Sequence, residues 1–360
     1  MHEFGQGGTD RVCTHLARGC VDAGYAVELL VLFGRAPAAA DMLALVGPDV
    51  TVRVLNQGRG SRHVGRLYVL RRFVARLRAV APDVVVSTGN NMNWVTALAF
   101  RLARVDRSRL VLKITNPVLR PKDGPVRRLY RHMRYRRAFD KAAAILTLSD
   151  AETALLRRTF PGSAGRIQTV INPYVTPSML SASDRGSGER DLILSIGRLA
   201  AQKRYDLLIR AFGEARIPGA RLVILGEGPD RGALQALVRE LDLAERVSLP
   251  GYQPQVEPWL RRARVFALSS RYEGLPAVVL EAMAANCPVV TTDCFLSARS
   301  LVGDAEGCAV VPDPIPSAFA RAMESAWFQH PPSTLASVAG RYSIEKGAAS
   351  HVASIGALLD

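Results

Sequence analysis

The sequence predicts an α/β protein of two domains, each built on a parallel β-sheet with helices on both faces. Three observations predict this fold class. The chain has 360 residues, more than a single hydrophobic core usually organises. Short apolar runs alternate with amphipathic stretches from end to end, and a segment rich in Ser, Pro, Gly and charge interrupts them at residues 172–190.

The first half predicts a Rossmann-like domain over residues 1–175. Its apolar runs predict strands at residues 26–33, 50–55, 83–88, 110–115, 142–148 and 167–171. Helical patterns lie between them near residues 9–23, 62–80, 92–104, 124–138 and 150–159. In the second of these helices we expect Leu67, Leu70, Val74 and Leu77 to form one apolar stripe. Continuous apolar strands joined by helices are typical of parallel sheets.

The second half repeats this scheme and predicts a Rossmann-like domain over residues 188–342. Its strands are expected at residues 192–196, 221–225, 247–249, 265–268, 289–292 and 309–311. A last helical pattern, over residues 343–360, carries Ile344, Ala348, His351, Ile355 and Leu358 on one side. From this pattern alone, the closing helix could cover the second domain or cross back to the first.

The start of the first domain departs from the scheme. A Rossmann-like unit opens with a buried strand that leads into a glycine turn, yet six residues precede Gly7 and Gly8. We expect either a sheet that lacks this strand beside a cleft, or a start codon upstream of Met1. The intact glycine turn favours the second interpretation.

The positive charge of the chain is concentrated in one half. The formal net charge is +15, and residues 1–180 hold 28 basic and 12 acidic side chains, whereas the remaining residues hold 19 and 20. No apolar run reaches the roughly 18 to 20 residues of a membrane-spanning helix. Residues 1–5 do not resemble a signal peptide, and five cysteines without a CxxC pair indicate neither a disulfide framework nor a zinc site. We therefore expect a cytoplasmic protein.

Two stretches of the first half carry the surplus charge, residues 59–78 and 120–141. Nine basic residues of the second stretch interleave with apolar ones such as Leu129, Tyr130 and Met133. Such a surface is compatible with a simple solvated face, but it also suits docking on an anionic membrane. Nucleic-acid binding is disfavoured because aromatic residues make up only 6% of the chain and no nucleic-acid motif is present.

Two cations follow the first strand of the second domain. Arg198 comes directly after the strand at 192–196, and Lys203 opens the next helical pattern. Both would lie at the carboxyl edge of a parallel sheet, where ligands of open α/β sheets bind. A guanidinium fork and a compact ammonium together suit a diphosphate, although a solvated surface pair is an equally simple interpretation.

A glutamate-containing segment follows the strand at 265–268. Glu273 is expected in a loop and Glu281 about two turns into the next helix, with Pro276 in its first turn. The free amides near residues 275–278 would lie at the positive end of the helix dipole and attract an anion. Carboxylates on either side could accept hydrogen bonds from sugar hydroxyls. The alternative is that Glu281 pairs with an arginine and Glu273 merely caps.

Three segments of the second half resemble the donor-binding half of glycosyltransferase family 4, the glycosyl transferases group 1. They are GRLAAQKRYDLLIRAF, LGEGPDRGALQALVRELDLAERVSLPGY and SSRYEGLPAVVLEAMAANCPVVTTD. The opening GQGGTDRV resembles that family's N-terminal glycine loop, and residues 342–359 resemble its closing helix, which returns to the first domain. The resemblance covers nearly the whole chain. It implies the GT-B architecture, two Rossmann-like domains facing across a cleft, with the acceptor on the side of the first domain.

The resemblance also implies a reaction and assigns residues to it. It implies retaining transfer from a nucleotide-diphosphate sugar, with no metal and no cofactor. Arg198 and Lys203 would hold the diphosphate, and Glu273 would meet hydroxyls of the donor sugar. The remaining donor-binding positions are Gly7, Gly8, Gly226, Tyr252, Leu275, Pro276, Ala277 and Glu281. Glu281 would meet the ribose, and the base would lie near Gly226 and Tyr252.

The acceptor side departs from the family pattern. Many members carry a histidine after the strand equivalent to 83–88 or 110–115, and this chain has Asn91 and Asn116 in those regions. Asparagine can orient a hydroxyl but cannot act as a general base. His2, His15, His63 and His132 are further candidates, each more simply explained by packing or exposure. Asn286, Cys294 and Ser300 depart from the family pattern near the donor sugar.

The motifs together with the resemblance imply a retaining, metal-independent hexosyltransferase. The donor would supply a hexose or acetamido-hexose, and the acceptor would be a growing, lipid-linked glycan of the exopolysaccharide or lipopolysaccharide type. We expect the protein to be peripheral at the inner face of the cell membrane. A nucleotide-sugar epimerase with the same architecture, a non-catalytic homologue and a nucleic-acid-binding module are the alternatives.

Overall fold

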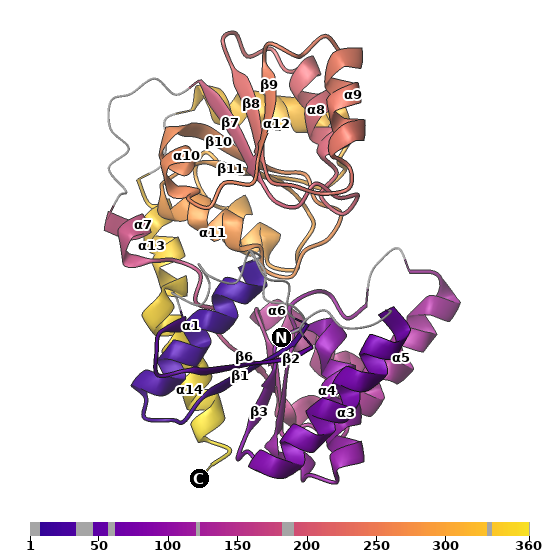
Figure 1. Ribbon diagram of the computed structural model, residues 1–360. Helices are drawn as coiled ribbons and strands as arrows, with labels where there is room; N and C mark the ends of the chain where they lie inside the picture. Colours follow the sequence, from indigo (N-terminus) through magenta and orange to yellow (C-terminus); the bar gives the residue numbers. More distant parts are fainter. Residues whose placement is uncertain are drawn as a thin grey trace. The chain divides into compact units, whose positions relative to one another are not determined.

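The computed structural model divides the chain into two compact units. It describes residues 8–33, 46–56, 62–119, 123–181, 191–329 and 333–359. One unit comprises Met1–Pro173 together with Ile344–Asp360, and the other comprises Tyr174–Ser343 (Figure 1). Each unit is α/β with parallel strands, so the predicted fold class is confirmed. In the described ranges, no helix is long and apolar enough to cross a membrane.

The strands of the first unit form two parallel sheets in its described residues. One sheet pairs β1 (Glu28–Phe33) with β2 (Thr51–Asn56). The other has the order β3 (Val85–Ser87), β4 (Leu110–Lys113), β5 (Ala144–Thr147) and β6 (Ile167–Thr169). All six strands fall within or one residue beyond the predicted apolar runs.

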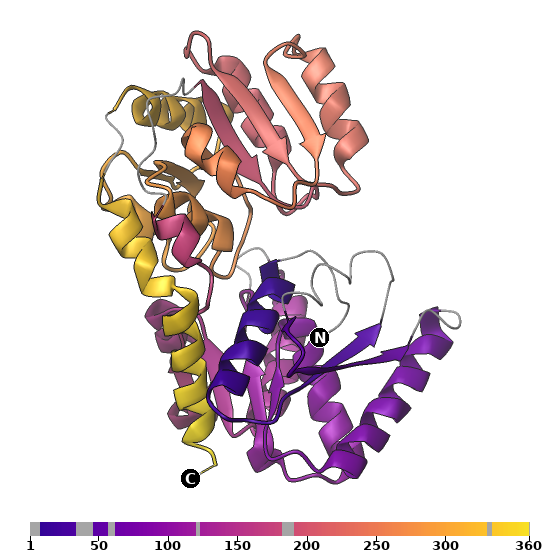
Figure 2. The same ribbon diagram turned by 60° about the vertical axis from the view of Figure 1, so that its left-hand side comes forward.

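The first unit contains the following helices in its described residues, including two short 3-10 helices. They are α1 (Gly8–Asp22), α3 (Arg62–Val80), α4 (Asn90–Ala103), η1 (Arg107–Arg109), α5 (Pro125–Phe139), α6 (Asp150–Thr159), η2 (Pro161–Arg166) and α14 (Ile344–Gly356). α14 packs along α1, where Gly19 lies against Ala348, and the Ile171 N–H donates to Ser350 Oγ at 3.1 Å. The closing helix is therefore part of the first unit (Figure 2).

The apolar stripe expected on α3 is only partly buried. Val69, Phe73 and Leu77 are buried, with Leu70 and Val74 partly buried beside them, whereas Leu67 is 60% exposed. Val69, Phe73 and Leu77 follow one another at intervals of four residues and so share one side of the helix. Leu67 does not lie on that side of the helix. The sequence pattern alone allowed two faces, because apolar residues lie on more than half of this helix.

The second unit has one six-stranded parallel sheet. Its strand order is β12 (Ala309–Val311), β11 (Val289–Thr292), β10 (Ala263–Leu268), β7 (Leu192–Ile196), β8 (Arg221–Leu225) and β9 (Val247–Gly251). The order runs outward in both directions from the neighbours β7 and β10. This is the doubly wound arrangement, in which the direction of winding reverses between two adjacent strands.

Helices cover both faces of this sheet. The helices described in this unit are α7 (Pro177–Ser181), α8 (Tyr205–Glu214), α9 (Arg231–Glu240), α10 (Glu257–Arg262), α11 (Ala277–Ala284), α12 (Pro316–Phe328) and α13 (Leu335–Ala339). A π-helical turn, η3 (Arg299–Gly303), and a 3-10 helix, η4 (Gly340–Tyr342), complete the described elements. Phe212, Phe266 and Phe319 are fully buried in the core between sheet and helices. This core holds the carboxyl ends of the strands in place.

Candidate functional site

The loops after β7 and β10 meet at the edge of the second unit's sheet. β7 and β10 are adjacent and parallel, so both end at the same edge. The loop at 197–204 follows β7, and the loop at 269–276 follows β10. In open α/β sheets, the crevice for a ligand lies outside the carboxyl ends of the strands at this reversal point. These two loops therefore border the expected ligand-binding crevice.

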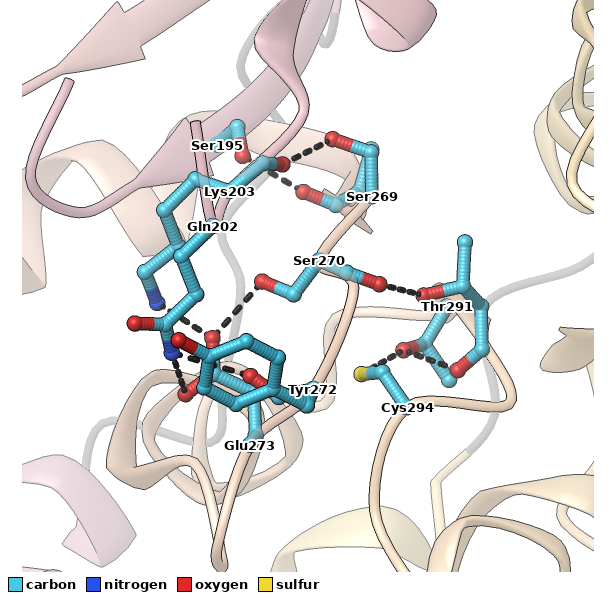
Figure 3. Close-up of polar contacts among 11 residues, drawn as sticks. Ser195, Gln202, Lys203, Ser269, Ser270, Tyr272, Glu273, Thr291 and Cys294 are labelled. Atoms are coloured by element: carbon cyan, nitrogen blue, oxygen red, sulfur yellow. Dashed lines mark hydrogen bonds and ion pairs between the residues drawn. The ribbon is translucent and has the colours of Figure 1, made fainter. Parts of the chain in front are cut away.

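An ion pair joins the two loops. Lys203 Nζ lies 2.8 Å from Glu273 Oε1, and the two side chains are 16% and 11% exposed (Figure 3). Charges removed this far from water attract each other more strongly than a surface pair does. The sequence singled out both residues, and the structure brings them together.

Further side chains orient the Glu273 carboxylate. Ser270 Oγ donates to Glu273 Oε1 at 2.7 Å. Gln202 Nε2 donates to the Tyr272 carbonyl at 2.9 Å and lies 3.5 Å from Glu273 Oε2, as Figure 3 shows. The sequence did not single out Gln202 or Ser270. The sequence offered one indication of their role: Gln202 is adjacent to Lys203, and Ser270 lies three residues before Glu273.

Hydrogen bonds to main-chain groups also join the same two loops. Ser269 Oγ donates to the Lys203 carbonyl at 2.8 Å, and the Arg271 N–H donates to the Gln202 carbonyl at 2.8 Å. The Glu273 N–H donates to the Cys294 carbonyl at 2.7 Å. Burial raises the pKa of the Cys294 thiol to about 12, so this cysteine remains a neutral packing residue. These hydrogen bonds connect the loops after β7 and β10 to each other and to the segment around Cys294.

Arg198 and Lys203 differ in their surroundings. Arg198 lies in the turn after β7 and is exposed to solvent. Lys203 was expected to open a helix but lies in a turn, because Arg204 adopts a left-handed φ of 50° and α8 begins only at Tyr205. The turn directs the lysine toward Glu273 rather than along the helix. Arg198 is available to a ligand from solvent.

Two glycines allow the loops after β7 and β8 to touch. Gly226 has a φ of 140°, and a Cβ placed on it would overlap the carbonyl oxygen of Gly197. The Gly226 N–H in turn donates to the Gly251 carbonyl at 2.8 Å, at the end of β9. Tyr252 follows and is 41% exposed. Gly226 and Tyr252 therefore lie at the same sheet edge as Lys203.

The start of α11 differs from the prediction in register. The helix begins at Ala277, with Pro276 as its N-cap, so Glu281 lies just over one turn into it rather than two. Glu281 is 2% exposed. Val279 N–H donates to the Pro276 carbonyl at 3.1 Å, and no hydrogen bond engages the N–H groups of Ala277 and Val278 within the described chain. Those two amides and the helix dipole can receive an anion.

Two of the residues that depart from the family pattern have structural roles. Asn286 follows α11 with a left-handed φ of 51°, and its Oδ1 accepts the Ala336 N–H at 2.9 Å. Ser300 Oγ donates to the Ser297 carbonyl at 3.3 Å within the π-helical turn. Neither contact involves the Lys203–Glu273 pair.

Two family models match the chain, one for each unit. The model described as "Glycosyl transferases group 1" matches residues 182–331, and the "Glycosyl transferase 4-like domain" matches residues 7–173. The chain belongs to the group 1 glycosyltransferases. Its second unit corresponds to the first of these models and contains the ion pair.

Curated relatives of this glycosyltransferase are distant. An uncharacterized glycosyltransferase of Methanocaldococcus jannaschii, MJ1059, is 26% identical over 63% of this chain, which spans only 59% of that relative's length. A Campylobacter jejuni enzyme is 26% identical over a region that covers 85% of this chain and 83% of the length of that enzyme. It is an N-acetylgalactosamine-N,N'-diacetylbacillosaminyl-diphospho-undecaprenol 4-alpha-N-acetylgalactosaminyltransferase.

A solved structure shows the same fold as this glycosyltransferase. Anabaena Alr3699/HepE in complex with UDP and glucose has a TM-score of 0.77 at 19% identity, covering 99% of this chain and 98% of that one. At this identity the likeness concerns the fold alone. The GT-B architecture expected from the sequence is thereby confirmed.

In the first unit of this glycosyltransferase, Asn90 rather than Asn91 contacts the loop after β4. Asn90 Oδ1 accepts the N–H groups of Thr115 and Asn116 at 2.9 and 3.1 Å, and Asn90 Nδ2 donates to the Asn116 carbonyl at 2.7 Å. Asn91 lies in the first turn of α4, and its side chain is outside the described residues. Asn116 is half-buried, and Asn90 holds its main chain.

The remaining first-unit candidates are dispersed. Gly8 is the first residue of α1, and Gly7 and His2 lie outside the described residues. His15 is half-buried, and burial lowers its pKa. His132 stacks on Phe160 with ring centroids 4.8 Å apart, which makes it a packing residue. The side chain of His63 is also outside the described residues.

Helix α5 presents basic and apolar side chains to solvent together. Val126 is 82% exposed, and Leu129 and Tyr130 are each 59% exposed. Arg127, Arg128, Arg136 and Arg137 are exposed on the same helix. Two other arginines are engaged locally, since Arg131 pairs with Asp123 at 2.8 Å and Arg134 lies over the Trp94 ring. The helix thus has the composition of a membrane-docking surface.

Proposed function

We propose that this glycosyltransferase transfers a hexose or acetamido-hexose from a nucleotide-diphosphate sugar to a lipid-linked glycan, with retention of configuration and without a metal. The observation that carries the proposal is the Lys203–Glu273 pair at the reversal point of the second unit's sheet. It places a cation and a carboxylate side by side where a donor with a charged diphosphate and a hydroxyl-rich sugar would bind.

The positive groups of this edge suit the diphosphate. The Lys203 ammonium has three N–H donors, so it can keep its bond to Glu273 and still donate to a phosphate oxygen. Arg198 adds a second cation, and the amides of Ala277 and Val278 add the positive end of α11. Groups held in place before reaction stabilise the charge that develops on the leaving diphosphate, the electrostatic role that a divalent ion can also fill.

The carboxylates suit the hydroxyls. Glu273 is oriented by Ser270 and Gln202, so its free lone pairs point in defined directions toward a donor sugar. Glu281, buried in α11, is proposed to meet the ribose. Gly226 and Tyr252 are proposed to border the base.

A same-face reaction accounts for the acceptor side. The departing phosphate oxygen would take the proton of the attacking hydroxyl while the new glycosidic bond forms on the face that the leaving group vacates. Such a step needs no protein base, and Asn116 can orient the acceptor by hydrogen bonds. Asn90 would act as a positioning residue through the loop that it holds.

The lipid-linked acceptor is proposed from α5 together with the relatives. The name of the Campylobacter jejuni relative describes an undecaprenol-linked acceptor. The exposed arginines of α5 can meet anionic headgroups, at about 1 kcal/mol per basic residue near the surface, while Val126, Leu129 and Tyr130 enter the interface. The protein would then work as a peripheral enzyme at the cytoplasmic membrane face.

The reaction is tested by product analysis. Nucleotide sugars are first screened by thermal shift, because a bound donor raises the melting temperature by mass action. The donor found is then incubated with lipid-linked acceptors, and NMR gives the anomeric configuration of the product. An α-linked product from an α-linked donor supports the proposal. An inverted product contradicts retention, and a free epimerised sugar nucleotide identifies an epimerase instead.

The membrane surface is tested with vesicles of phosphatidylglycerol and phosphatidylcholine. Replacing Arg127, Arg128, Arg136 and Arg137 with Gln should reduce sedimentation with these vesicles. A matched variant replaces four exposed arginines of the second unit, Arg221, Arg239, Arg321 and Arg341, and removes the same charge. Equal loss in both variants would show a nonspecific charge effect and contradict docking through α5.

A further inference from the structure

The side chain of Tyr174 reaches the turn that leads into α11. Its hydroxyl donates to the Leu275 carbonyl at 2.9 Å, although 101 positions separate the two residues in the sequence. Leu275 lies directly before Pro276, the N-cap of α11, and is 5% exposed. A carbonyl ahead of the N-cap has no partner in the ladder of its own helix, so the tyrosine supplies one from a distant part of the chain.

The main chain of Tyr174 is itself held in place. Tyr174 is the first residue of the second unit, and Ser343 is the last. The N–H groups of Tyr174 and Val175 both donate to the Tyr342 carbonyl, at 3.1 and 3.0 Å, and Val175 forms a parallel bridge with Ser343. Tyr174 therefore belongs to a pair of joined segments through which the chain enters and leaves this unit, rather than to a free loop.

The covalent link between the Leu275 carbonyl and the first amide of α11 is stiff. The Leu275–Pro276 peptide bond is planar, and the proline ring locks the φ angle of Pro276, which is −74°. Between this carbonyl and the Ala277 N–H, only the ψ angle of Pro276 is a soft torsion. A hydrogen bond that fixes the carbonyl therefore also limits the directions in which the Ala277 N–H can point.

The amides at the start of α11 are the groups on which this contact acts. Ala277 and Val278 are half-buried, and their N–H groups engage no hydrogen bond within the described residues. In the proposed function these amides receive the donor diphosphate. The direction of an N–H group matters for such a contact, because hydrogen bonds weaken steeply as they bend.

We propose that Tyr174 is a positioning residue for the donor diphosphate, a role that rests on the proposed function. The Tyr174 hydroxyl fixes the Leu275 carbonyl, and the rigid Pro276 thereby aims the Ala277 N–H at the phosphate oxygens. Phenylalanine would keep the aromatic ring but leave the Leu275 carbonyl without this donor. The hydroxyl itself touches neither the phosphate nor the sugar.

Tyr174→Phe tests this role, because it removes the hydroxyl and keeps the ring. Calorimetry on the full chain, below its melting temperature, measures affinity for uridine, guanosine and adenosine diphosphates and for the three nucleosides. The control Tyr68→Phe removes a hydroxyl from α3, where it accepts from Arg72 at 3.0 Å. We expect Tyr174→Phe to bind the preferred diphosphate about fivefold more weakly and its nucleoside unchanged, and Tyr68→Phe to bind both as the parent does.

A second substitution tests the route through Pro276. Pro276→Ala frees the φ angle at this position, so that the Leu275 carbonyl no longer fixes the Ala277 N–H. In the Pro276→Ala background, loss of the Tyr174 hydroxyl should weaken diphosphate binding by less than about twofold. An equal loss in both backgrounds would show that the hydroxyl acts by another route and would overturn the proposal.

The nucleoside measurement separates positioning from a role in stability alone. If Tyr174→Phe melts at a lower temperature but keeps the parent's ratio of diphosphate to nucleoside affinity, the hydroxyl only stabilises the fold and the proposal is overturned. A parent chain that binds no nucleoside diphosphate would contradict the proposed function together with this role. Equal diphosphate binding by the parent and Tyr174→Phe would contradict the role of Tyr174 alone.

Discussion

Lys203 and Glu273 form a 2.8 Å ion pair across two loops that are far apart in the sequence and adjacent in the sheet. Their strands, β7 and β10, are the neighbours at which the winding of the sheet reverses. The pair therefore exists because of the sheet order, not because of any local sequence pattern. It lies at the edge of the sheet where ligands of open α/β proteins bind.

The pair should contribute to stability as well as to binding. In a double-mutant cycle of Lys203→Met and Glu273→Gln, each single variant leaves the other group buried without its charge partner. We expect a coupling free energy of about 1–3 kcal/mol from urea unfolding. A coupling near zero would show that the two side chains do not interact in solution.

Gln202 should act on the reaction through Glu273. Gln202→Leu removes the donor to Glu273 Oε2 and to the Tyr272 carbonyl, whereas Gln202→Glu keeps the shape and replaces the donor with an acceptor. We expect kcat to fall about tenfold or more in both variants, while affinity for the nucleoside diphosphate changes little. A rise in KM with unchanged kcat would show instead that Gln202 binds the donor equally well in the ground state and in the transition state.

Gly226 should not tolerate a side chain. Gly226→Ala places a methyl group against the Gly197 carbonyl at a φ of 140°, so we expect a loss of about 2 kcal/mol or more in unfolding free energy. Gly232, in α9, has no atom within 4 Å of the position that a Cβ would take. Gly232→Ala is the control and should be neutral or stabilising, since alanine favours a helix. Equal effects of the two substitutions would contradict the close approach of the loops.

Glu152 should make the first unit less stable as the pH rises. The N-cap Ser149 accepts the Glu152 N–H, and Glu152 Oε2 accepts the N–H of Leu148, the residue before the N-cap. Burial raises the pKa of this carboxyl from 4.5 to about 7. The folded state therefore binds more protons than the unfolded state between these values, and stability falls through this range.

Glu152→Gln removes this dependence. We compare the unfolding free energy of the variant with that of the parent chain at each pH. This difference should favour the variant by up to about 3 kcal/mol more at pH 8 than at pH 4, since the neutral amide needs no proton. Thermal unfolding at a series of pH values measures the slope. An unchanged difference between the two proteins across pH 4 to 8 would show that the Glu152 carboxyl keeps its ordinary pKa when folded.

The sequence predicted more of the fold than of the side-chain contacts. Strand positions follow from apolar runs, which are local, and the six strands of the second unit lie where these runs indicated. Gln202 and Ser270 were missed because their contacts depend on β7 pairing with β10. Asn90 was missed beside Asn91 because a one-residue step rotates a helical side chain by about 100°. The apolar stripe of α3 does not coincide with its buried face, because this helix has apolar residues on two faces and Leu67 is exposed.

The central claim is that Lys203 holds the diphosphate of a nucleotide-sugar donor, and calorimetric binding of nucleoside diphosphates tests it most directly. Uridine, guanosine and adenosine diphosphates are titrated into the parent chain, Lys203→Gln and the control Lys141→Gln, which removes an exposed lysine of the first unit. We expect one diphosphate to bind the parent and Lys141→Gln alike, and to bind Lys203→Gln at least about tenfold more weakly. Equal affinity of a folded Lys203→Gln variant would contradict the account.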